Sequence, residues 1–220
     1  ALDANTTADN NTAVGKSALT ANTTGTSNIA VGKSALEVNT TSSNNTAVGL
    51  SALAANTTGA NNTSVGRESL LANTTGTSNS AFGSTSLDAN TTGDYNTAIG
   101  QATLGANTTA SNNTAVGYAA LLVNTTGADN VAVGKGALDA NTTANGNVAI
   151  GLDALGATTT GNYNTAVGYN ALLTNVDGDR SVAIGTDALK VQEPASNVDM
   201  YNVAVGHSAG MAVSTGIKNT

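Results

Sequence analysis

The sequence predicts an all-β fold, a parallel β-solenoid in which each turn, or rung, contains 17 residues. A glycine recurs every 17 residues without a slip from Gly15 to Gly185, and a fixed short period of this kind is typical of solenoid proteins. Helical solenoids need about 33 residues or more per repeat, and the Thr, Asn and Gly of this repeat are poor helix formers. Two short strands and two turns per rung account for the unit, and about 13 rungs at ~4.8 Å make a rod on the order of 60 Å long.

The repeated glycine is assigned to a corner of each rung, because glycine reaches positive φ without strain. One further glycine follows after 21 residues, so four residues are inserted between Val191 and Tyr201. We therefore divide the chain into regular repeats over 1–189, an irregular rung over 190–205 and a resumed repeat over 206–220, and we expect the chain to continue beyond both ends. The corner glycines are Gly15, Gly32, Gly49, Gly66, Gly83, Gly100, Gly117, Gly134, Gly151, Gly168, Gly185 and Gly206.

Apolar residues occupy the same positions in every repeat and form columns along the solenoid. Side chains alternate between the two faces of a strand, so Ala13 and Val14 point in opposite directions and both faces carry apolar columns. We expect Val14 and Leu19 to fill the coil, while Ala13 and Ala18 approach neighbouring chains in a parallel homotrimer. The alternative is a wide monomeric coil with an exposed Ala/Thr face. The predicted core columns begin with Val14, Val31 and Val48, and with Leu19, Leu36 and Leu53.

An N-T-T corner recurs once per repeat. Identical asparagines stacked one rung apart can pair side chain to side chain, so we interpret these residues as a structural ladder. Each is also formally an acceptor sequence for N-glycosylation, which is the alternative interpretation. The corner asparagines are Asn5, Asn22, Asn39, Asn56, Asn73, Asn90, Asn107, Asn124 and Asn141.

Tyrosines lie at positions of the repeat that vary from rung to rung and are therefore expected at the surface. They occupy two columns and are the candidate contacts for a ligand. The alternative is that they are scattered surface residues without a function. The first column contains Tyr95, Tyr163 and Tyr201, and the second contains Tyr118 and Tyr169.

The composition excludes several classes of function. With 14 acidic and 7 basic residues the net charge is −7, which argues against nucleic-acid binding because phosphate contacts need clustered Lys and Arg. No apolar run approaches the roughly 18 residues of a membrane-spanning helix, and no cysteine is present. The single histidine, His207, has no second ligand column beside it. We therefore predict no catalytic residue, metal or cofactor, and no enzyme activity.

The unit N-T-A-V-G-x-x-A-L, found from Asn11 to Leu19 and from Asn113 to Leu121, resembles the head repeats of trimeric autotransporter adhesins. The segment from Gly161 to Tyr169 is similar to glycine- and asparagine-rich repeats of phage tail fibres. The resemblance implies a parallel homotrimer of β-solenoids that forms an extracellular attachment fibre on a virion or a cell. The unit here is longer than the adhesin unit, and neither a stalk nor a membrane anchor is present in this segment.

We therefore expect an adhesive fibre shaft that presents a receptor-binding tip or binds host glycans. Two rival functions remain. A flat face of Thr and Asn with rung spacing could order water and bind ice, although Thr23 and Thr24 are expected to point to opposite sides. A glycan-degrading enzyme would need clustered carboxylates, whereas the acidic residues are scattered over variable positions.

Overall fold

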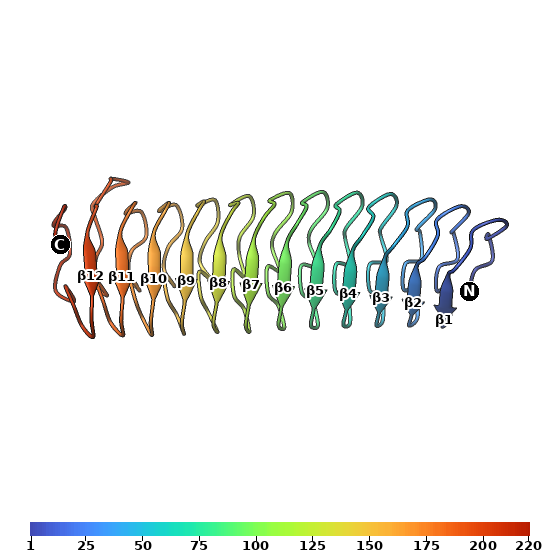
Figure 1. Cartoon of the computed structure of the whole chain (residues 1–220), viewed down its shortest axis with the longest axis horizontal. Helices are drawn as coiled ribbons and strands as arrows, with labels where there is room; N and C mark the ends of the chain where they lie inside the picture. Colours follow the sequence, from blue (N-terminus) through green and yellow to red (C-terminus); the bar gives the residue numbers. More distant parts are fainter. The chain divides into compact units, whose positions relative to one another are not determined.

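The computed structural model describes all 220 residues and confirms an all-β parallel solenoid with 17-residue rungs (Figure 1). The chain divides into two compact units, Ala1–Ser111 and Asn112–Thr220. Each rung contributes one three-residue strand. The first unit holds β1 (Thr12–Val14), β2 (Ile29–Val31), β3 (Thr46–Val48), β4 (Thr63–Val65), β5 (Ser80–Phe82) and β6 (Thr97–Ile99). The second holds β7 (Thr114–Val116), β8 (Val131–Val133), β9 (Val148–Ile150), β10 (Thr165–Val167), β11 (Val182–Ile184) and β12 (Val203–Val205).

Within each unit every strand pairs in parallel with the strand of the next rung. The register stacks equivalent residues, for example Ala13 on Ala30 in the first unit and Ala166 on Ala183 in the second. The four-residue insertion leaves this register intact, because Ala183 still pairs with Ala204. The extra residues form an excursion of the chain between β11 and β12 (Figure 1).

The expectation of two strands per rung is wrong, because the segment after the corner glycine forms a turn. In the first such turn, Ser17 and Leu19 both have positive φ, at 57° and 50°. A left-handed conformation costs roughly 1–2 kcal/mol for a residue other than glycine. Full burial of a leucine side chain contributes about 1.5–3 kcal/mol, and Leu19 is fully buried. Burial therefore outweighs the backbone strain, and the turn recurs along the chain.

The expectation that Val14, Val31 and Val48 fill the coil is also wrong. Val14 is 58 % exposed, whereas Ala30, the middle residue of the next strand, is fully buried. The middle residue of each strand points inward. Leucines and asparagines from the other side of the rung share this interior, so the strand has room for a methyl group but not for a valine side chain. The leucines Leu19, Leu36 and Leu53 do lie fully buried inside the coil.

Two ladders of buried asparagines run through the interior of the coil. In the first ladder, which contains the N-T-T asparagines, Asn73 Nδ2 donates to Asn56 Oδ1 at 3.0 Å and to the Gly76 carbonyl at 3.0 Å. In the second ladder, which begins at Asn11, the Asn79 backbone N–H donates to Asn62 Oδ1 at 2.9 Å. Asn62 Nδ2 donates to the same Gly76 carbonyl at 2.8 Å. The interior is therefore polar on one side and its amides are paired from rung to rung.

The corner glycines allow the rungs to stack closely. Gly168 has φ of +137°, and a Cβ on this residue would lie 2.6 Å from the carbonyl oxygen of Gly185 in the next rung. Both the backbone conformation and the close approach of the two rungs therefore require glycine at this position.

Candidate interaction surface

The outer face of the strands is an uncharged surface whose side chains are exposed or half-buried. We define the outer face as the side chains of the first and third residues of each strand, which point away from the coil interior. None of these residues is charged. In the first unit the third residues are Val14, Val31, Val48, Val65, Phe82 and Ile99, and in the second unit they are Val116, Val133, Ile150, Val167, Ile184 and Val205.

The first residue of each strand differs between the two units. In the first unit it is mostly threonine, as in Thr12, whereas in the second unit it is mostly valine, as in Val131 and Val203. Six rungs at ~4.8 Å, with two columns about 7 Å apart, give an outer face on the order of 200 Å² per unit. Contiguous exposed apolar patches larger than a few hundred Å² mark contact sites in soluble proteins, and the outer face of one unit approaches that size.

The first tyrosine column is divided between the units. Tyr95 is 63 % exposed in the first unit, while Tyr163 and Tyr201 lie in the second. The Arg180 guanidinium lies over the Tyr163 ring at 5.3 Å from its centroid. On the other side of the ring, a Cβ added at Gly146 would lie 2.7 Å from Tyr163 Cδ1. Both neighbouring rungs therefore contact the Tyr163 ring.

Arg180 also fixes the chain excursion before β12. Its Nε forms an ion pair with Asp199 Oδ1 at 2.6 Å, and Tyr201 Oη donates to Asp199 Oδ2 at 2.9 Å. Both bonds lower the pKa of Asp199, and the hydrogen bond from Tyr201 makes a larger contribution than the one from Arg180. Arg180 occupies the tyrosine column, one rung after Tyr163, and only this shared position could have indicated the contact from the sequence.

The second tyrosine column does not form a compact site. Tyr118 and Tyr169 are both exposed, but three rungs separate them, and Lys135 and Leu152 occupy the rungs between. Exposed Tyr118 and Tyr169 flank the outer face, because each follows the third strand residue by two positions.

The structure brings together two pairs of acidic residues that are apart in the sequence. Burial raises the pKa of Asp139, and the charge of Asp153 raises it further. Burial raises the pKa of Asp88 in the same way, with a contribution from Glu68. A shallow surface depression beside the first pair is lined by Asp139, Asp153, Gly156, Ala157, Leu173 and Thr174.

Neither acidic pair includes a histidine, and no group of three or more His, Cys, Asp or Glu side chains comes together in the chain. His207 is exposed. The pKa of Asp187 is lowered mainly by the hydrogen bond from Lys190, and the charge of His207 makes a smaller contribution in the same direction.

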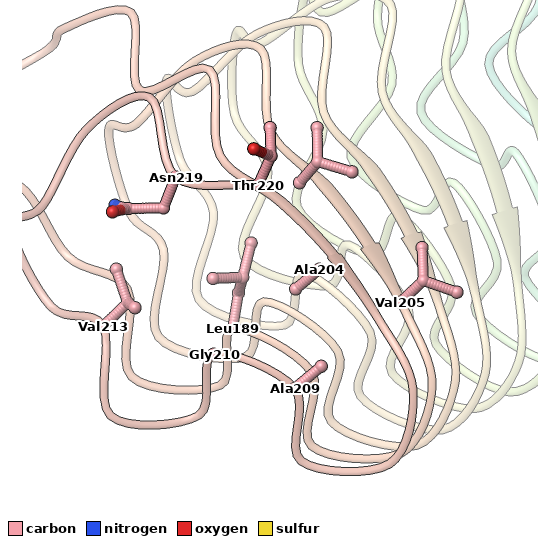
Figure 2. A pocket seen from close by; sticks show the side chains of 9 residues that line it. Leu189, Ala204, Val205, Ala209, Gly210, Val213, Asn219 and Thr220 are labelled. Atoms are coloured by element: carbon pink, nitrogen blue, oxygen red, sulfur yellow. The ribbon is translucent and has the colours of Figure 1, made fainter.

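A hollow of about 280 Å³ with a mixed apolar and polar lining lies at the last rung of the second unit (Figure 2). Gly210 occupies the position that holds leucine in the earlier rungs, so no side chain fills this part of the coil. Figure 2 shows Leu189, Ala204, Val213 and Asn219 around the hollow. It contains no ionisable side chain.

No protein family, no curated protein and no solved structure matches this chain. None of its segments is a helix with the length and apolar character needed to cross a membrane.

Proposed function

We propose that this chain is a shaft segment of an extracellular fibre on a virion or a cell surface. In this proposal three copies pack in parallel along their outer faces, and the fibre presents a receptor-binding tip or binds host glycans. The protein has a structural and adhesive role and no enzyme activity.

The observation that carries the proposal is the uncharged outer face, which has an exposed or half-buried Val, Ile or Phe at every rung. A surface whose features recur at each rung is complementary to another surface with the same spacing, and a second copy of the chain has that spacing. Closed cyclic symmetry is the usual way for identical chains to bury one such face. The resemblance of the repeats to those of trimeric adhesins and tail fibres supports three copies.

The valines that replace threonine in the second unit support self-association. Val131 and Val203 each place additional apolar surface on the outer face, where water would otherwise contact them. Burial of apolar surface contributes about 25 cal/mol per Å², so a face on the order of 200 Å² per unit stabilises an assembly by several kcal/mol before the entropy of association is subtracted.

Exposed tyrosine rings are the candidate glycan contacts. Tyr95, Tyr118 and Tyr169 are exposed, and no aromatic or cation–π contact is formed by any of the three. Tyr163 is less suitable because Arg180 lies over its ring. A glycan would therefore contact the first unit at Tyr95 or the margin of the outer face at Tyr118 and Tyr169.

The double substitution Val116→Asp and Val133→Asp tests self-association. Because both side chains point outward, we expect the variant to keep its β-structure by circular dichroism and to be monomeric by light scattering, while the unmodified chain is trimeric. Val116→Thr with Val133→Thr is the matched control and should remain trimeric. A monomeric unmodified chain would refute the trimeric shaft.

Ice binding is a second candidate, which the first unit favours. Thr12, Thr46 and Thr63 each share the outer face with a valine two residues later, which gives Thr-x-Val rows on one sheet. The Thr23 and Thr24 corner argued against ice binding, because its two side chains are expected to point to opposite sides. A thermal-hysteresis measurement distinguishes the two proposals, since an ice-binding face must be free in solution and a fibre seam is buried.

A further inference from the structure

The repetition of the outer face creates a problem of register for any assembly of identical chains. In the first unit the third strand residue is Val or Ile at every rung but one. A second copy shifted by one rung would therefore make nearly the same contacts as a copy in register. Strand pairings with so little variation are prone to slip, so a defined fibre needs a feature that distinguishes one rung from the others.

β5 is the rung that differs. Phe82 is the only phenylalanine of the chain, it lies in the valine column of the outer face, and 40 % of it is exposed. Ser80 lies two residues earlier on the same face, where the other strands have Thr, Ile or Val, and it is the only serine at that position. One rung thus combines the largest side chain of the outer face with the smallest.

The neighbouring rungs do not offer the same space. Ser80 pairs with Thr63 of β4 and Thr97 of β6, and Phe82 pairs with Val65 and Ile99. Threonine has a methyl group that serine lacks, so the face is recessed only at Ser80. A phenylalanine ring that approaches from a partner meets this recess at the height of β5 and meets a threonine methyl one rung away in either direction.

We propose that Phe82 and Ser80 set the register between copies of this chain, with the Phe82 ring of one copy packed over Ser80 of its neighbour. This inference rests on the proposed self-association along the outer face. A misplaced large side chain in a packed contact is unfavourable, so the in-register assembly is selected over assemblies that are shifted by one or more rungs.

Disulfide cross-linking can measure the register, because the chain has no cysteine. Val48→Cys and Val31→Cys place thiols on the outer face of adjacent rungs, β3 and β2. When chains with either substitution are refolded together and oxidised, we expect links between identical positions to exceed links between positions 48 and 31 at least about tenfold.

Moving the Phe/Ser pair by one rung provides the decisive comparison. A chain with Ser80→Thr and Phe82→Val, together with Thr63→Ser and Val65→Phe, carries the pair on β4. This chain also receives Val31→Cys and is refolded with a second chain whose only substitution is Val48→Cys. When the phenylalanine ring at position 65 of the first chain aligns with Phe82 of the second, position 31 of the first chain lies beside position 48 of the second. We then expect the 48–31 link to become about as frequent as the links between identical positions, which pairs of like chains still form. Chains that lack the pair, with Ser80→Thr and Phe82→Val alone, should form links between identical positions and links between positions 48 and 31.

The results separate the two proposals. Light scattering on the same samples reports whether the chains associate, and monomers would overturn both the shaft and the register pair. Oligomers whose 48–31 link stays rare after the pair is moved would overturn the register pair alone. All six substituted residues lie on the outer face, so circular dichroism should show unchanged β-structure in every variant.

Discussion

Gln192 Nε2 donates a hydrogen bond to Ser181 Oγ at 3.0 Å in the buried interior of the second unit. Ser181 stands where the second ladder otherwise has asparagine, and Gln192 stands where the first ladder does. The longer side chain reaches across to the shorter one. Gln192 also donates to Asn175 Oδ1 at 3.0 Å and accepts from Asn202 Nδ2 at 2.8 Å. One glutamine therefore joins Asn175, the last asparagine of the first ladder, to Asn202, with which the second ladder continues past the insertion.

This arrangement predicts that the two residues are energetically coupled. Ser181→Asn should crowd the Gln192 carboxamide, and Gln192→Asn should leave Ser181 without its partner, so each variant should lose roughly 1–3 kcal/mol of stability. The double variant restores the ordinary ladder residues and should lose less than the sum. A double-mutant cycle by urea denaturation measures the coupling. Additive losses would show that the contact has no energetic role.

Thr158 interrupts the first ladder and predicts a stabilising substitution. Asn141 Oδ1 is buried and has no hydrogen-bond partner, because threonine has no amide to donate to it. The Gly161 carbonyl accepts from Asn147 Nδ2 at 2.8 Å, and an asparagine at position 158 would donate to it as well. Thr158→Asn should therefore raise the free energy of unfolding by about 1 kcal/mol.

The reverse change in an intact part of the ladder is the control for this prediction. Asn56→Thr removes the donor to Asn39 Oδ1, which lies 2.9 Å away, and should destabilise the chain by roughly 1–3 kcal/mol. Both variants are compared with the parent chain by denaturant midpoint. Equal effects of the two substitutions would contradict the ladder as a source of stability.

The two glycine columns should respond differently to alanine. Gly168→Ala forces a side chain into a positive φ and against the next rung, and we expect a loss of several kcal/mol or failure to fold. A second glycine column lies three residues after the N-T-T asparagines; it contains Gly127, and the chain itself has Ala110 and Ala144 there. A Cβ at Gly127 would also press on the Ala144 carbonyl oxygen, but Gly127 is not in the left-handed region and the column accepts alanine. We therefore expect Gly127→Ala to cost clearly less than Gly168→Ala. Thermal unfolding of the two variants tests the contrast, which comparable melting temperatures would disprove.

The raised pKa of Asp139 predicts a pH-dependent gain from its removal. Because folding raises this pKa through burial and the charge of Asp153, the folded chain holds the proton more tightly than the unfolded chain. The resulting stabilisation is present below the ordinary aspartate pKa of about 3.9 and is lost as the pH rises through the raised value. Asp139→Asn cannot ionise and should be more stable at neutral pH.

Urea denaturation at neutral and acidic pH measures this difference. We expect a gain of roughly a few tenths of a kcal/mol at neutral pH, since the site is partly solvated, and no gain in acid. Asp129→Asn, at an exposed position, removes the same charge without relieving burial and is the control. A gain that persists unchanged in acid would point to a cause other than ionisation.

The repeat period and the corner glycines were predictable because both depend on local chemistry that recurs in the sequence. A two-residue alternation also showed that Ala13 and Val14 face opposite ways. It did not show which of them faces inward, since that depends on what the other side of the rung places in the interior. Leu19 reaches the interior from a left-handed turn, and residue preferences do not predict such a conformation for leucine.

The candidate site was predicted only in part for the same reason. The tyrosine columns follow from counting in steps of 17, but the packing of Arg180 on Tyr163 and the ion pair with Asp199 depend on the course of the inserted segment. The outer face was assigned to the wrong residues, because the valines expected in the coil lie outside it.

The sequence by itself determined the solenoid class, the period of its rungs and the polar ladders, because identical residues one period apart must stack in register. Only the tertiary structure decided that alanine, leucine and asparagine fill the coil and that valine faces outward. The physical reason is volume: once leucine and asparagine occupy the interior of a 17-residue rung, the strand can add only a methyl group. Its larger apolar side chains are left on the surface where another chain can cover them.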